Sequence, residues 1–136
     1  MAPGQAFASI NWLAVLVAAV STFLLGGLWY GPLLGRAWMR ASGMTEEQAK
    51  QGNMGMVFGV SFVLQLVAAL VLAMFIGGDA TAMFGLFAGA SVGVAWVASA
   101  LGVIYLFEQR PFGHWMVNAG YHVVSFTIMG LILGAW

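Results

Sequence analysis

The side chains with the most scope for chemistry are polar groups set within apolar runs. Four of them follow one another at steps of four, four and three residues: His114, Asn118, His122 and Ser125. That spacing places them near one face of an α-helix. An imidazole buried in such a helix can relay protons or bind a metal or haem. His122 lies deepest in its apolar run and is the first residue to test.

A purely structural interpretation of His122 stays open beside the functional one. A neutral imidazole could be hydrogen-bonded to Gln65 or to a serine across a helical bundle. Haem needs two axial ligands that face one another, and both histidines fall on the same predicted helix. Only a symmetric dimer could bring two copies of His122 together. We therefore expect no metal site and no cofactor.

Uncharged polar residues also recur inside the other apolar runs. An unpaired donor in hydrocarbon is costly, so we expect these groups to face a bundle interior or an interface between copies. Side-chain amides can line a hydrated path, but they can equally join helices by hydrogen bonds. The predicted polar path or interior network comprises His122, Asn118, His114, Gln65, Asn11, Ser61 and Ser99.

The sequence offers no pattern typical of an enzyme or of a nucleic-acid binder. It has no Ser-His-Asp set, no paired carboxylates within an apolar run and no phosphate-binding glycine loop. Its net charge is zero, which leaves no basic face for nucleic acid, and it has no cysteine to ligate a metal. We expect neither enzyme activity nor nucleic-acid binding.

The composition indicates lipid rather than water as the surroundings of the chain. Of the 136 residues, 62% are hydrophobic and only 6% are charged. A soluble domain usually carries about 25% charged residues. The chain therefore reads as an integral membrane protein whose first partner is the bilayer.

Four apolar runs are long enough to cross that bilayer. They cover about residues 8–31, 54–77, 81–106 and 113–135, with Ser9 as the expected N-cap of the first. Short turns join the second to the third and the third to the fourth, which forces antiparallel neighbours. We predict one all-α domain over residues 1–136, an integral membrane four-helix bundle built of two helical hairpins.

The longest connection, residues 32–52, contains features of its own. Apolar residues there share one helical face, and Arg36 and Arg40 lie four apart on another. This pattern predicts a short interfacial helix ended by Gly43. Thr45 and Gln48 match a capping box that opens a further helix. The alternative is a solvated loop that carries two arginines.

All four cations lie in the first and third connections: Arg36, Arg40, Lys50 and Arg110. By the positive-inside rule these connections are cytoplasmic and both termini are outside, in a bacterial inner membrane. Aromatic residues gather at the same level and are expected to anchor the protein in the interface. The predicted interfacial and topology-setting residues are Trp29, Tyr30, Pro32, Arg36, Trp38, Arg40 and Arg110.

Glycine spacing supplies a second signal, which concerns helix packing. Gly85, Gly89 and Gly93 form two consecutive Gly-x-x-x-Gly steps, and single steps occur at Gly55–Gly59 and Gly130–Gly134. Such steps let helix backbones approach closely within lipid. One glycine face could serve inside the bundle and another in self-association. We therefore expect a homo-oligomer.

Several short stretches resemble one known family. They are Asn11-Trp12-Leu13-Ala14-Val15, Gly27-Leu28-Trp29-Tyr30-Gly31-Pro32, Gly35-Arg36-Ala37-Trp38 and Gly52-Asn53-Met54. The family consists of small bacterial and fungal membrane proteins and is catalogued as domain of unknown function seventeen sixty-one. The resemblance covers nearly the whole chain. It implies a membrane protein that crosses the bilayer four times, and it brings no activity or substrate with it.

Two functions of different classes remain. The first is a small homo-oligomeric scaffold or accessory protein that stabilises a larger membrane assembly. The second is a channel or transporter for a small solute, with a polar path along the fourth span. A haem or quinone protein is a third possibility, resting only on His122 and the aromatic residues. A continuous cavity beside His122 favours transport, and a dry, packed centre favours the scaffold.

Overall fold

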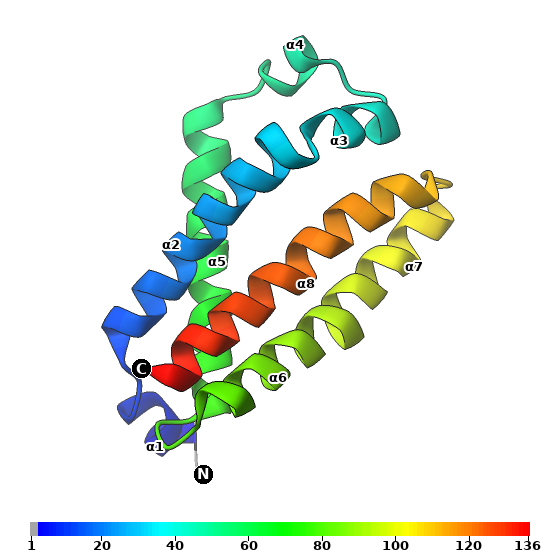
Figure 1. Ribbon diagram of the computed structural model, residues 1–136. Coiled ribbons are helices and arrows are strands. Elements are labelled where there is room, and N and C mark those ends of the chain that lie inside the picture. The colour runs from blue at the N-terminus through cyan, green and yellow to red at the C-terminus, as the bar shows by residue number, and fades with distance from the viewer. Residues whose placement is uncertain (1–2) are drawn as a thin grey trace.

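The structure is a computed structural model that describes residues 3–136, and every regular element in that range is a helix. Four helical stretches are long and apolar enough to cross a membrane. They are Trp12–Leu33, Met54–Ile76, Ala82–Phe107 and Phe112–Ala135. The predicted all-α membrane fold with four spans is confirmed (Figure 1).

The first span begins later than the sequence suggests. A short helix, α1 (Pro3–Ala8), precedes it, and the span itself opens with α2 (Trp12–Leu28). The Asn11 side-chain oxygen accepts a hydrogen bond of 3.1 Å from the Ala14 amide. Ser9 instead donates its hydroxyl back to the Ala6 carbonyl at 3.0 Å. The prediction that Ser9 caps this span is wrong, because Asn11 performs that role.

The span ends in a π-helical turn, η1 (Trp29–Leu33), which contains Pro32. Gly31, just before the proline, leaves helical geometry with φ −102° and ψ −107°. The chain then folds back into α3 (Gly35–Ser42). A Cβ on Gly35 would lie 2.5 Å from the Tyr30 carbonyl oxygen, so this close approach requires glycine. Because of the kink, α3 lies across one end of the bundle (Figure 1).

The predicted helix caps within this connection are confirmed. Gly43 terminates α3 in the left-handed conformation at φ 74°. Thr45 and Gln48 form both hydrogen bonds of the capping box that opens α4 (Glu46–Ala49). Lys50 pairs with Glu46 at 2.9 Å, and this contact lowers the pKa of the Glu46 carboxyl.

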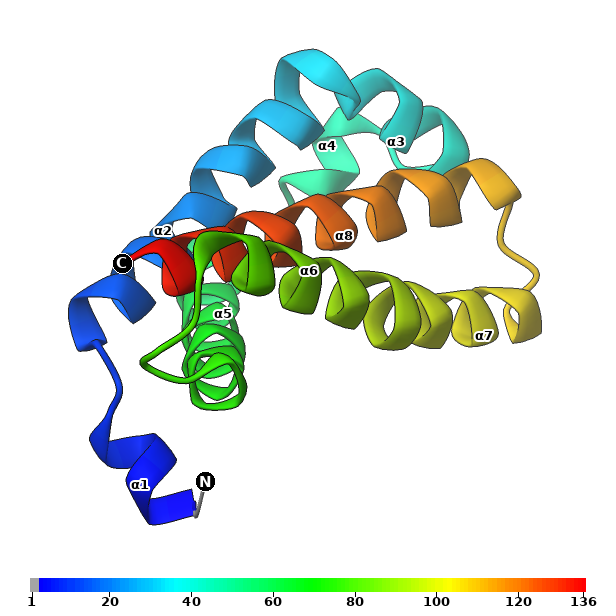
Figure 2. The same ribbon diagram turned by 60° about the horizontal axis from the view of Figure 1, so that its bottom comes forward.

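The remaining spans follow the predicted order. The second is α5 (Met54–Ile76), which ends before Gly77 at φ 82°. The third consists of α6 (Ala82–Val92), a π-helical segment η2 (Gly93–Ala98) and α7 (Ser99–Phe107). The fourth is α8 (Phe112–Ala135). Figure 2 shows α8 between α2 on one side and the third span on the other.

The closest helix pair is α6 with α8, and glycine makes it possible. A Cβ added to Gly89 would collide with the carbonyl oxygen of Phe126, and one added to Gly85 would collide with that of Gly130. On Gly93 it would lie 2.8 Å from the Val123 Cα. The glycine steps of the third and fourth spans therefore meet each other within one chain.

The packed core lies in the half of the bundle that holds both chain ends (Figure 1). Its buried residues come from three helices: Val15, Ala18 and Ala19 of α2, Ala69, Leu72 and Ile76 of α5, and Met129 of α8. The N-terminal half of α5 is largely exposed. Packing is thus tight at one end of the bundle and open at the other.

Candidate functional site

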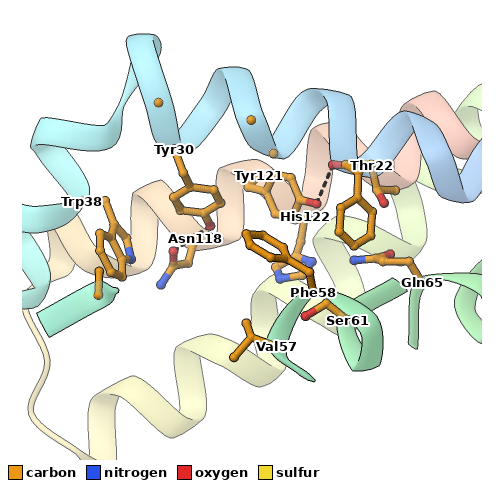
Figure 3. A pocket seen from close by; sticks show the side chains of 15 residues that line it. Thr22, Tyr30, Trp38, Val57, Phe58, Ser61, Gln65, Asn118, Tyr121 and His122 are labelled. Atoms are coloured by element: carbon orange, nitrogen blue, oxygen red, sulfur yellow. Dashed lines mark hydrogen bonds between the residues drawn. The ribbon is translucent and has the colours of Figure 1, made fainter. Parts of the chain in front are cut away.

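A cavity of about 750 Å³ occupies the open half of the bundle (Figure 3). Its walls come from α2, η1, α3, α4, α5 and α8, and this size is typical of small-molecule sites. The described residues that line it carry no formal charge. Besides the indole N–H of Trp38, its polar side chains are Thr22, Tyr30, Ser61, Gln65, Asn118, Tyr121 and His122.

Asn118 organises the wall nearest α3. Its side-chain oxygen accepts a 2.7 Å hydrogen bond from the Tyr30 hydroxyl, and its amide donates to the Tyr105 hydroxyl at 2.8 Å. Trp38 from α3 meets the Tyr30 ring edge-on, with centroids 6.2 Å apart. Because Asn118 is bonded on both sides, its role here is to hold Tyr30 in place.

Two further hydrogen bonds fix the first span against α8, one from α2 and one from η1. Tyr121 donates its hydroxyl to the Thr22 carbonyl at 2.9 Å, drawn as a dashed line in Figure 3. The Trp29 indole N–H donates to the Val117 carbonyl at 2.9 Å. Gly120 makes room for that indole, since a Cβ there would lie 3.0 Å from the ring. These contacts hold the first span against α8 at the wall of the cavity.

His122, Gln65 and Ser61 form the second polar group of the cavity. Gln65 and Ser61 project from α5 toward the side that His122 occupies from α8 (Figure 3). Among the side chains of residues 3–136, no hydrogen bond joins any two of these three. The Nδ1 atom of His122 is buried and has no partner. The structural alternative for His122, a bond to Gln65 or to a serine, is not realised.

Three predicted site residues lie away from this cavity. His114 is buried and stacks on Tyr105 at 4.9 Å. Ser99 is exposed, and its hydroxyl donates to the Val94 carbonyl at 3.2 Å across the π-helical segment. Asn11 caps α2 at the opposite end of the bundle. These three residues do not line the cavity.

The polar residues predicted to share one face of the fourth span point into different surroundings, for a geometric reason. Steps of four residues overshoot a helical turn of 3.6 residues, so His114 and His122 point about 80° apart. Asn118 and His122 line the cavity, whereas His114 turns toward α7. Ser125 is buried, and its hydroxyl has no partner. One stripe in the sequence thus serves two different environments.

The sequence analysis missed the aromatic part of the site. It treated Tyr30 and Trp38 as interface anchors, and it did not single out Tyr121 or Phe58. In the structure all four line the cavity, and the Tyr30 and Tyr121 rings lie 5.3 Å apart. The available signal was the tyrosine inside an apolar run, because a buried hydroxyl needs a partner.

The predicted interfacial arginines lie outside the cavity lining. Arg36 and Arg40 are exposed on α3. Arg110 pairs with Glu108 at 2.9 Å and lies over the Tyr105 ring, 5.5 Å from its centroid. Their charges stay at the end of the bundle while the cavity itself remains neutral.

This arrangement can bind an uncharged molecule between aromatic walls and hydrogen-bond it to amide, hydroxyl and imidazole groups. Among residues 3–136, no group of three His, Cys, Asp or Glu side chains is placed to hold a metal ion. The polar groups that line the cavity suit recognition by shape and hydrogen bonds.

Comparison with known proteins places the chain in a family. The family described as "Protein of unknown function (DUF1761)" matches residues 13–134, which is almost the entire sequence. The chain belongs to this family. The resemblance noted from the Trp-Tyr-Gly-Pro element is therefore confirmed. No curated protein and no solved structure matches the chain.

Proposed function

We propose that the protein is a membrane carrier that binds a small uncharged molecule in the cavity and moves it between the two faces. The single observation that carries this proposal is the cavity of about 750 Å³ beside His122, whose buried Nδ1 atom has no hydrogen-bond partner. A bundle that acted only as a scaffold would gain stability by filling that space.

The neutral lining supports an uncharged solute. A charged group inside the membrane needs a counter-ion or water to offset its desolvation. None of the described lining residues supplies a charge. The core residues Ala18, Leu72 and Met129 close the bundle beyond the cavity. Passage to the far side therefore needs a second conformation, which is why we propose a carrier rather than an open channel.

The proposed orientation in the membrane follows from the positions of the cations. Arg36, Arg40 and Lys50 lie in the connection that borders the open half of the bundle. Under the positive-inside rule this half faces the cytoplasm of a bacterial inner membrane, and both termini are outside. The proposal assigns no chemical conversion to the protein and no catalytic role to any residue.

Two glycines provide a matched pair of variants for the test. Gly27 and Gly59 both lie in spanning helices, and a Cβ added to either meets nothing within 4 Å. Only Gly27 lines the cavity. Gly27→Phe should therefore fill the cavity without breaking a helix contact, and Gly59→Phe should leave the cavity open.

The measurement is flux of radiolabelled neutral solutes, from urea to a nucleoside, into liposomes that contain the purified protein. We expect at least one solute to enter faster than into protein-free liposomes, with Gly27→Phe abolishing the excess and Gly59→Phe retaining it. Both variants are first checked for an unchanged elution volume. Equal flux in the two variants, or no excess flux for any solute, contradicts the carrier.

The homo-oligomeric scaffold remains a second candidate because one glycine face is unused. Gly55 and Gly59 lie on the exposed surface of α5. No other helix occupies the space where a Cβ on either would lie. If this face holds copies together within a larger assembly, Gly59→Leu should lower the mass of the detergent-solubilised particle. An unchanged mass removes the support for this candidate.

A further inference from the structure

We infer that the molecule bound in the cavity is planar and uncharged and carries a carboxamide-type group, one that donates and accepts hydrogen bonds side by side. This inference rests on the proposed function and narrows its substrate class. It follows from which polar groups of the cavity are already bonded and which are left for a ligand.

Four of the seven polar side chains are occupied within the protein. Thr22 donates its hydroxyl to the Ala19 carbonyl at 2.7 Å, and Tyr121 donates to the Thr22 carbonyl at 2.9 Å. Tyr30 and Asn118 are bonded to each other. These groups shape the wall, and their hydrogen-bonding capacity is largely spent.

Besides the Trp38 indole N–H, the unoccupied groups are those that face each other across the cavity. Gln65 offers two N–H donors and a carbonyl acceptor, and a neutral His122 offers one donor and one acceptor. Ser61, one turn from Gln65 on α5, adds a hydroxyl that can do either. A partner that only accepts, or only donates, would leave some of these groups unpaired. A carboxamide-type group matches both kinds at once.

The aromatic walls favour a flat molecule. Phe23 comes from α2 and Tyr121 from α8, and Phe58 comes from α5. Phe58 exposes 56% of its surface, so its ring is free to cover a ligand. Offset stacking on such rings stabilises planar groups. The same walls carry no charge that would retain a carboxylate.

Three probes of nearly equal size separate these requirements: benzamide, acetophenone and benzoate. Benzamide donates and accepts, acetophenone only accepts, and benzoate accepts but is charged. Binding is measured by saturation-transfer NMR with the protein in lipid nanodiscs. We expect benzamide to bind at least about tenfold more tightly than either of the other probes, because a site built for an amide leaves groups unpaired around them.

Gln65→Leu is expected to remove this preference, so that benzamide binds no more tightly than acetophenone. Ser99→Ala is the matched control, since it deletes a polar group on the exposed face of the third span. The three probes are also compared on the unaltered protein, and this comparison holds even where a variant fails to fold. His122→Phe is a second variant, which removes the polar imidazole from the wall opposite Gln65.

Equal binding of acetophenone or benzoate, or a benzamide preference that survives in Gln65→Leu, overturns the amide assignment. Absence of binding by all three probes overturns it as well. The flux experiment keeps the two proposals distinguishable. Excess flux that Gly27→Phe blocks would uphold the carrier even where the amide class fails, and its absence would remove the carrier itself.

Discussion

The Tyr30 hydroxyl donates a hydrogen bond of 2.7 Å to the Asn118 side-chain oxygen, 88 positions further along the chain. The Asn118 side-chain N–H donates a second hydrogen bond, of 2.8 Å, to the Tyr105 hydroxyl. One amide thus joins the ends of the first, third and fourth spans at the border of the cavity. It also holds the Tyr30 ring in the wall of the cavity.

Removing this amide should weaken the bundle measurably. Hydrogen bonds between helices in a membrane contribute about 0.6 kcal/mol on average and up to about 1.7. Tyr30→Phe deletes one such bond and should cost about that much. Asn118→Ala deletes two and should cost about 1–3 kcal/mol, counted as two such bonds. Unfolding in mixed detergent micelles measures both, and the double variant should cost less than the sum of the singles. Strict additivity would show that the two residues do not interact.

The third and fourth spans should tolerate no side chain at their crossing. Gly89→Ala places a methyl group against the Phe126 carbonyl and should destabilise the protein by about 1–3 kcal/mol, as other overpacked sites do. Gly59→Ala is the control, because a Cβ there meets nothing within 4 Å. Thermal unfolding of the two variants checks this. Equal midpoints would contradict the glycine contact.

Much of the fold can be predicted from the sequence because the responsible signals are local. Span length follows from the length of the apolar runs, and the cap at Thr45 follows from its spacing to Gln48. Gly43 ends α3 at φ 74°, a conformation that glycine adopts without strain. The glycine at this position is visible in the sequence. These features need no knowledge of which helices touch.

The site depends on tertiary packing, so the sequence predicts only part of it. Asn118, His122, Gln65 and Ser61 were expected in a shared polar network, and they do line one cavity. The aromatic wall was missed because Tyr30 and Trp38 also suit an interface. Only the kink at Gly31 turns α3, and Trp38 with it, back over the bundle. The cavity itself exists because α5 packs with α2 at one end only, which no local pattern encodes.

The orientation of the chain can be tested with single cysteines, since the natural sequence has none. Gln51→Cys lies in the first connection and Asp79→Cys in the second, and both positions are exposed. A membrane-impermeant maleimide applied to intact bacteria should label Asp79→Cys at once. It should label Gln51→Cys only after the cells are permeabilised, because the positive-inside rule keeps that connection in the cytoplasm. The reverse pattern would invert the proposed orientation.

The central claim is that the cavity beside His122 admits water and solute from the end of the bundle that carries the cations. Its most direct test is the reaction rate of Ser61→Cys with a charged, water-soluble thiol reagent added to inverted membrane vesicles. Val63→Cys on the exposed surface of α5 and Ala69→Cys in the core serve as controls. We predict that Ser61→Cys reacts much faster than both. A rate no higher than that of Val63→Cys would show that the space is closed to water, and the carrier proposal would be wrong.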